Sequence, residues 1–404
     1  MNGGAGGERA PGRVLTPGLA AVIVTGALTY LAMGMTTLTL PYRVTALGGG
    51  NLAVGAVVGS MFASAVLARP FVGRMGARVS RRWLVLGGAG LDAVCFSLYG
   101  QVPAVWGLAC VRLLNGLGEA MFYTGSATLV TDLVPASRRT QAVSYYSVSV
   151  YLGTGLGPSI AVAIIHRAGQ SWAFACAGLT AALAALLATR LPSPSIDARP
   201  GHRLPWVSRR AVLPGSVLAF GTSGVVAFSA YMALYARHLH MSGVQYVFLT
   251  YSAVIVLVRL AGRIHLLSPM TVARTATAAI VTGLCVVALV PAEPAIYVGT
   301  AVFASGIALQ FPALMGLALR DAPDYERASV VGTYTAFMDL SQGVSGFLLG
   351  AATAIAGYRA AFGCSAVLAL SGLSMLLVVT RRGGVTLRAA RPAAAAPADP
   401  AAAD

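Results

Sequence analysis

Residues 112–158 read RLLNGLGEAMFYTGSATLVTDLVPASRRTQAVSYYSVSVYLGTGLGP, which predicts two membrane-spanning helices joined by a short basic loop. The first helix carries Arg112 and Glu119 in an otherwise apolar run, and the second ends its glycine-rich turns at Gly157-Pro158. A charged side chain at the centre of a membrane helix costs about 2.5–3.5 kcal/mol on the insertion scale, and such residues mark pathways for ions or substrates. We therefore expect the rest of the chain to be arranged around such a pathway.

The composition of the whole chain is that of an integral membrane protein. Of its 404 residues, 57% are hydrophobic and 10% are charged, and the mean hydropathy is +0.76. Soluble domains carry about 25% charged residues. This chain has too few polar side chains to cover a soluble globule, so we expect it to be surrounded by a lipid bilayer.

The basic residues and the cysteines exclude two other classes of protein. The net charge is +16, and all 28 basic residues are arginines. Most of them lie in short loops between apolar runs, as in membrane proteins, so we do not expect a nucleic-acid partner. The five cysteines fall inside apolar runs without a C-x-x-C pair, so we expect neither a disulfide framework nor a metal site, and no cofactor.

Twelve apolar runs are long enough to span a membrane, for which about 20 residues are needed. They lie at about 17–40, 51–72, 83–101, 103–131, 140–166, 170–190, 211–236, 243–262, 269–290, 294–319, 329–356 and 358–380. With the N-terminus placed inside, 21 loop arginines fall on the cytoplasmic side and four (Arg43, Arg167, Arg237 and Arg359) on the other. The positive-inside rule then places both termini in the cytoplasm of a cell-membrane protein.

The chain divides into two similar halves. A linker rich in proline and arginine, residues 191–210, separates a first six-helix bundle at 16–190 from a second at 211–380. A shift of 188 residues places Tyr146 on Tyr334 and Gly155 on Gly343, and a shift of 190 places Val66-Leu67-x-Arg69 on Val256-Leu257-x-Arg259. We expect the end segments 1–15 and 381–404 to be disordered, because neither could build a core.

Three motifs carry a resemblance to the major facilitator superfamily. The segment GRMGARVSRR at residues 73–82 resembles that family's loop signature G-x-L-a-D-r-x-G-r-r through Gly73, Arg74 and Arg78. Ala77 and Ser80 replace the acidic residue and second glycine of the signature, so this chain lacks the acid that forms the family's conformational latch.

The other two motifs lie in the opening stretch. Arg112-x-x-x-Gly116 is similar to a motif of proton-coupled members, and Gly153-x-x-x-Gly157-Pro158 is similar to the core of an antiporter signature. The resemblance implies an all-α membrane protein of twelve transmembrane helices in two pseudo-symmetric six-helix bundles. It also implies a transporter rather than an enzyme. We expect a monomer that exports a small organic molecule in exchange for protons, with uptake of a metabolite as the alternative.

The polar stripe on the first helix supplies the leading candidates for the pathway. Arg112 and Glu119 are seven residues apart and share one helix face, which Asn115, Gly116 and Tyr123 extend. We expect Glu119 to carry the proton and Arg112 to influence it. The alternative is a structural ion pair that fixes this helix to a neighbour.

Further polar residues lie in other helices. Asp339 stands at the repeat position of Tyr151, which suggests an asymmetric polar site between the halves. Asp92 is either a functional acid or a partner for an arginine. Gln310, with Tyr30, could line a cavity or simply pack. A receptor or an intramembrane enzyme remains a remote alternative, because we find neither a long exposed loop nor a nucleophile with a base.

Overall fold

A computed structural model describes residues 16–76, 79–135, 138–193, 208–261, 268–320, 322 and 326–383. Across these ranges the chain forms twelve helices and no strands. Residues 1–15 and 384–404 of the predicted disordered ends and most of the predicted linker lie outside the described residues, as do Arg78 and the side chain of Arg74. Residues 381–383, predicted to be disordered, are helical instead. The prediction of an all-helical, twelve-helix protein is therefore confirmed.

The helices follow the predicted apolar runs closely. They are α1 (Pro17–Ala46), α2 (Asn51–Gly76), α3 (Arg81–Tyr99), α4 (Val105–Asp132), α5 (Arg139–Ala168), α6 (Gln170–Ala188), α7 (Arg209–His238), α8 (Val244–Leu260), α9 (Pro269–Leu289), α10 (Glu293–Leu319), α11 (Arg327–Ala356) and α12 (Tyr358–Gly383). Among the described residues, eight helices are long and apolar enough to cross a membrane. The other four are α3, α4, α8 and α11, of which α8 is short at 17 residues.

The internal repeat is visible in the helix positions. The starts of α3 and α9, at residues 81 and 269, differ by 188 residues, and the same shift relates α4 to α10, α5 to α11 and α6 to α12. Single glycines in the left-handed region separate α5 from α6 and α11 from α12, namely Gly169 (φ 91°) and Gly357 (φ 75°). A residue with a Cβ would be strained at either position. Corresponding helices of the two halves are thus connected by the same single-glycine turn.

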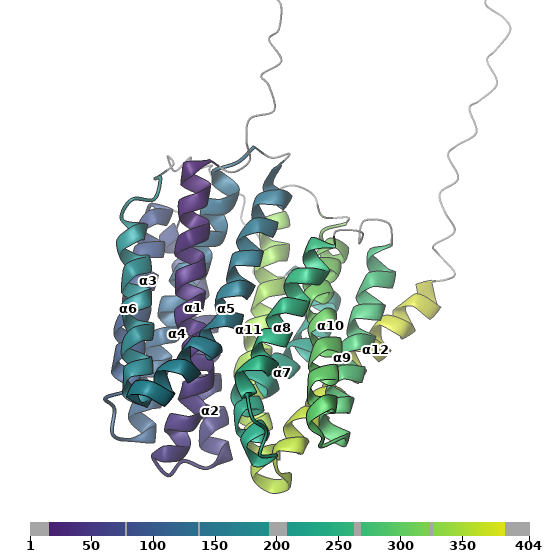
Figure 1. Ribbon diagram of the computed structural model, residues 1–404. Coiled ribbons are helices and arrows are strands. Elements are labelled where there is room, and N and C mark those ends of the chain that lie inside the picture. Colours follow the sequence, from purple (N-terminus) through teal and green to yellow (C-terminus); the bar gives the residue numbers. More distant parts are fainter. Residues whose placement is uncertain are drawn as a thin grey trace, which may run out of the picture.

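The two sets of six helices lie side by side and meet along a few pairs (Figure 1). Within the first half α1 packs on α5 and α6, and α3 packs on α4 and α6; within the second half α7 packs on α11 and α12, and α9 on α10 and α12. The halves join mainly through α2 with α11 and through α5 with α8, and to a lesser extent through α1 with α7. The repeat relates the first two of these interfaces to each other.

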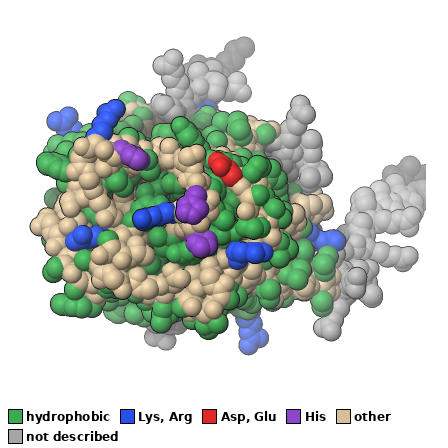
Figure 2. All heavy atoms as spheres, turned by 60° about the horizontal axis from the view of Figure 1, so that its bottom comes forward, with side chains coloured by type: hydrophobic (Ala, Val, Ile, Leu, Met, Phe, Trp, Pro, Cys, Tyr) green, Lys and Arg blue, Asp and Glu red, His purple; other side chains and the backbone are tan. Residues whose placement is uncertain are grey.

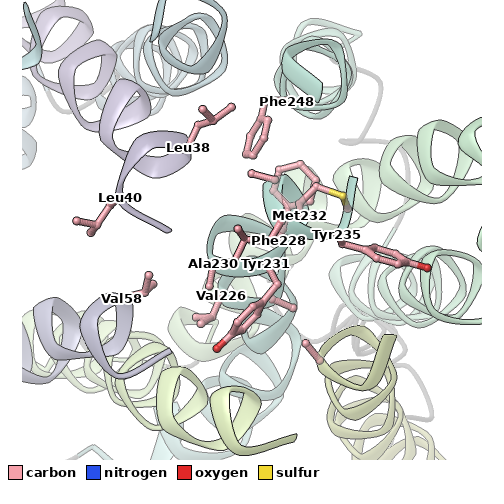
Figure 3. Close-up of a cluster of buried hydrophobic side chains, with 14 of the residues drawn as sticks. Leu38, Leu40, Val58, Val226, Phe228, Ala230, Tyr231, Met232, Tyr235 and Phe248 are labelled. Carbon is pink, nitrogen blue, oxygen red and sulfur yellow. The ribbon is translucent and has the colours of Figure 1, made fainter. Parts of the chain in front are cut away.

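Helix α7 is at the centre of a buried apolar cluster that connects both halves. Figure 3 shows Phe228 and Met232 on the side of α7 toward Phe248 of α8, with Leu38 of α1 beside Phe248, whereas Tyr231 points the opposite way. Burial of apolar side chains does not by itself drive association between helices in lipid, where close van der Waals packing contributes most. The cluster therefore joins the halves through contact between closely fitted side chains.

The halves are held together at the end of the molecule where α1 ends and α2 begins. Tyr42 Oη donates to Ala233 O at 3.0 Å, and Tyr231 Oη donates to Asn51 O at 3.1 Å. Asn51 Nδ2 in turn donates to Thr353 O at 3.4 Å. We call this the joined end. Figure 2 turns it toward the reader and shows a largely uncharged face with scattered basic and histidine side chains.

Candidate functional site

An ion pair crosses between the halves at the α2–α11 interface. Arg69 of α2 pairs with Asp339 of α11, and an Arg69 terminal nitrogen donates to Asp339 Oδ1 at 3.1 Å. Asp339 is buried, with 2% of its surface exposed. The Arg69 guanidinium also lies over the ring of Tyr123 in α4, 5.1 Å from its centroid. One arginine thus contacts a carboxylate of the second half and an aromatic ring of the first.

Glu119 lies near this ion pair but has a different partner. Tyr30 Oη of α1 donates to Glu119 Oε1 at 3.2 Å, and Tyr30 packs edge-on against Phe122. Glu119 also lies one helical turn before Tyr123 on α4, the residue whose ring is covered by Arg69. We define the central cluster as Tyr30, Arg69, Glu119, Tyr123 and Asp339. It contains two carboxylates, one of which is ion-paired while the other accepts a hydrogen bond from a phenol.

The remaining members of the predicted stripe form a separate network between α3 and α4. Arg112 Nη1 donates to Asn115 Oδ1 at 2.7 Å, and Asn115 Nδ2 donates to Asp92 Oδ1 at 2.7 Å. Tyr99 Oη also donates to Asn115 Oδ1, at 3.0 Å. Gly118 leaves room for the acid, since a Cβ there would lie 2.5 Å from Asp92 Oδ1. Asn115 therefore links the arginine to the acid, and Arg112 faces α3 whereas Glu119 faces α1.

The repeat-related interface between α5 and α8 has an arginine too. The guanidinium of Arg259 in α8 lies over the ring of Tyr151 in α5, 4.8 Å from its centroid. Arg259 is the repeat counterpart of Arg69, and Tyr151 is the counterpart of Asp339. Neither arginine was among the candidates chosen from the sequence. The shared Val-Leu-x-Arg pattern of the two halves was the signal that could have found them.

Gln310 and its neighbour pack inside the second half. Gln310 Nε2 donates to Thr277 Oγ1 of α9 at 3.2 Å, and the Gln310 side chain fills the space beside Gly221 of α7. The carbonyl oxygen of Phe311 accepts a hydrogen bond from Tyr334 Oη at 2.8 Å. The structure does not bring Gln310 into the central cluster.

Two hollows of the described surface lie away from the central cluster, and neither is lined by its carboxylates. The first, of about 300 Å³, lies between the ends of α7, α9 and α11 and is bordered by Tyr235, His238, Tyr358 and Arg359. The second is a groove of about 450 Å³ between α11 and α12, lined by Leu348, Cys364 and Val367. Within the described ranges, no group of three or more histidine, cysteine or acidic side chains could hold a metal ion.

Comparison with known proteins decides the family. The family model described as Major Facilitator Superfamily matches residues 22–346, most of the chain. The chain belongs to the major facilitator superfamily. An uncharacterised MFS-type transporter of Salmonella typhimurium is 27% identical over 366 residues, which cover 88% of this chain and 94% of the relative. The uncharacterised MFS-type transporter YhhS of Escherichia coli is 26% identical over 367 residues, covering 86% and 90%.

Solved structures support the same fold. The crystal structure of the nucleoside transporter NupG aligns with a TM-score of 0.71 and 14% identity, covering 88% of this chain and 99% of NupG. At this identity the likeness concerns the fold alone. This member of the major facilitator superfamily is thus a membrane transporter with two helical bundles. Its substrate and its coupling have to be inferred from its own residues.

The superfamily-like glycine motifs lie where helices approach closely. A Cβ at Gly157 would lie 2.5 Å from the backbone of Gly34, and one at Gly153 would lie 2.7 Å from Ala27 O, so this motif packs α5 on α1. Gly116 similarly places α4 against Met61 and Ser64 of α2. Pro158 lies inside the continuous helix α5. Gly73, in the loop motif, faces open space.

Proposed function

We propose that this transporter exports a small organic molecule in exchange for inward-moving protons, by alternating access between its two halves. The central cluster is the observation that carries the proposal. Arg69 already balances the charge of Asp339, whereas Glu119 has a phenol as its hydrogen-bond partner. Glu119 can therefore gain or lose a proton without breaking an ion pair, and we assign it the proton.

The arrangement of the halves supports alternating access. The hydrogen bonds described above hold the joined end together, and the arginine pairs lie along the interfaces farther from it. If both termini are cytoplasmic, as the loop arginines suggest, the joined end is the outer one and the protein is closed to the outside. We assign a structural role to Arg112, Asn115 and Asp92. Their hydrogen bonds fix α3 to α4, and we do not place them in the transport pathway.

The test uses inverted membrane vesicles, in which export appears as accumulation. Candidate substrates come from compounds that are more toxic to a strain lacking the gene. We expect an imposed proton gradient, acidic inside, to drive accumulation in vesicles with the natural protein and Glu119→Gln to abolish the response. Glu293→Gln, the same change at an exposed residue at the start of α10, is the matched control.

Each outcome has a definite meaning. Gradient-driven accumulation that survives Glu119→Gln would remove Glu119 from the mechanism. Accumulation of the compound in whole cells, rather than depletion, would show uptake instead of export. Equal rates with and without the gradient would show facilitated diffusion. We further propose that the working unit is a monomer, because each chain contains both halves.

A further inference from the structure

The two arginines at the interfaces between the halves are related by the internal repeat but have different partners. Arg69 of α2 reaches the carboxylate of Asp339 in α11. Arg259 of α8 reaches Tyr151 of α5, which occupies the repeat position of Asp339. The repeat therefore predicts an anion beside Arg259, and the chain supplies a neutral phenol at that position.

The guanidinium of Arg259 lacks the partners that a partly buried cation requires. Among the described residues no carboxylate lies within ion-pair distance of it, and its Nε is buried without a hydrogen-bond acceptor. A cation over an aromatic ring gains about 0.5–2 kcal/mol. Withdrawing a charge from water costs several kcal/mol in real proteins. The ring of Tyr151 alone leaves part of this cost uncompensated.

A second unsatisfied group lies on the same side of α8. Ser252 precedes Arg259 by seven residues, about two helical turns, and Ile255 between them is also buried. Ser252 is 5% exposed, its side chain faces Gly155 of α5, and its Oγ has no hydrogen-bond partner. The face of α8 toward α5 thus presents a guanidinium and a hydroxyl, both without acceptors.

We propose that Arg259 binds the anionic group of the transported molecule, a carboxylate that takes the place which Asp339 takes beside Arg69. The substrates are accordingly small organic acids in their ionised form. A carboxylate accepts two parallel N–H···O hydrogen bonds from a guanidinium. Such charge-assisted, bidentate hydrogen bonds are among the strongest that an arginine forms. This inference rests on the proposed function, because it names the class of molecule that is transported. Carboxylate binding itself can be tested without a proton gradient.

The test measures carboxylate binding to the detergent-purified protein through ligand-dependent thermal stabilisation. The probes are acetate, succinate, benzoate and 3-phenylpropanoate at constant ionic strength, each compared with its neutral primary amide. We expect at least one carboxylate to raise the unfolding temperature with a saturable dependence on concentration and its amide to have a much smaller effect. Arg259→Gln should weaken that binding about ten-fold or more, the value of a charge-assisted hydrogen bond.

Two further variants separate binding from folding. Tyr151→Asp supplies the missing acid within the chain, so we expect it to raise the unliganded unfolding temperature and to abolish stabilisation by carboxylates. Tyr151→Phe should retain binding. Arg237→Gln is the control, because Arg237 also lies over a tyrosine ring, that of Tyr42 at 5.9 Å, but at the joined end.

Several results would overturn the proposal. These are no stabilisation of the natural protein by any of the four carboxylates, equal stabilisation by acids and amides, or binding that survives in Arg259→Gln. Stabilisation by phosphatidylglycerol alone would assign Arg259 to a lipid headgroup and would equally overturn it. A failure of proton coupling with intact carboxylate binding would instead remove the proposed function and leave the anion site standing.

Discussion

Arg69 and Asp339 illustrate how single residues decide the energetics inside a membrane protein. Asp339 is buried and Arg69 is partly buried, so each charge depends on the other for compensation, and Tyr123 supplies an aromatic face in addition. Removing one partner of a buried pair leaves an unpaired charge and costs about 3–5 kcal/mol, whereas removing both is often nearly neutral. The two partners should therefore be strongly coupled in stability.

We predict that Arg69→Gln and Asp339→Asn each lower the unfolding temperature clearly and that the double variant recovers most of the loss. Thermal unfolding of the four proteins in detergent gives the coupling as a double-mutant cycle. Arg259→Gln offers the matched comparison, because that arginine has no acidic partner among the described residues, and we expect it to lose no stability. Additive losses in the cycle would contradict the pairing.

The polar network of Arg112, Asn115 and Asp92 makes a second prediction at this scale. Asn115→Leu removes the amide that links the arginine and the acid, so we expect a loss of stability of about 3 kcal/mol or more from the two stranded charges. Glu119→Gln should leave stability nearly unchanged, since a neutral amide oxygen can still accept the Tyr30 hydrogen bond. Comparable unfolding temperatures for the two variants would argue against a structural role for the network.

At the scale of helices, glycines set how closely α2 and α11 approach at the joined end. A Cβ at Gly346 would lie 2.5 Å from Gly59 Cα, far inside van der Waals contact. Small residues allow such backbone contact between membrane helices. Gly332, on the same helix α11, faces open space. The same substitution at these two positions thus separates the effect of crowding from the effect on helix propensity.

We predict that Gly346→Val forces α2 and α11 apart and opens the joined end, while Gly332→Val does not. The measurement is the labelling rate of a cysteine introduced at Val58, which is buried in the apolar cluster, by a membrane-impermeant maleimide in a variant without the five native cysteines. We expect a several-fold faster rate in Gly346→Val. Equal rates in the two valine variants would show that this contact does not control closure.

At the scale of the whole molecule, the proposed mechanism depends on which side of the membrane the joined end faces. Loop arginines set the orientation of membrane helices during insertion, and 21 of them fall on the side of the termini against four on the other. We therefore propose that the joined end, which includes the α11–α12 junction at Gly357, lies outside the cytoplasm.

Reporter fusions test this orientation. Green fluorescent protein fused after Gly383, at the end of α12, should fluoresce in cells, because it folds in the cytoplasm. Alkaline phosphatase fused after Gly357 should be active, because it needs an oxidising compartment outside the cytoplasm to form disulfides. The opposite pattern would invert the protein in the membrane and with it the direction of proposed transport.

The sequence by itself determined the class of the protein, its twelve helices, most of their limits to within about two residues, and their division into halves. These features follow from local signals: runs of about 20 apolar residues, arginines in the loops, and residues that recur at shifts of 188 and 190. The sequence also showed that Asp339 and Tyr151 occupy corresponding positions of the two halves. None of these inferences required knowledge of which helices are neighbours in the folded protein.

Only the tertiary structure decided the partners of the polar side chains. Helical periodicity places Arg112 and Glu119 within about 20° of one another around α4, yet Arg112 contacts α3 and Glu119 contacts α1. This small angular difference does not determine which neighbouring helix each long side chain reaches, because α4 packs on several helices at once. Likewise, only the meeting of α2 with α11 and of α8 with α5 shows that one arginine has an acid and its repeat counterpart has none.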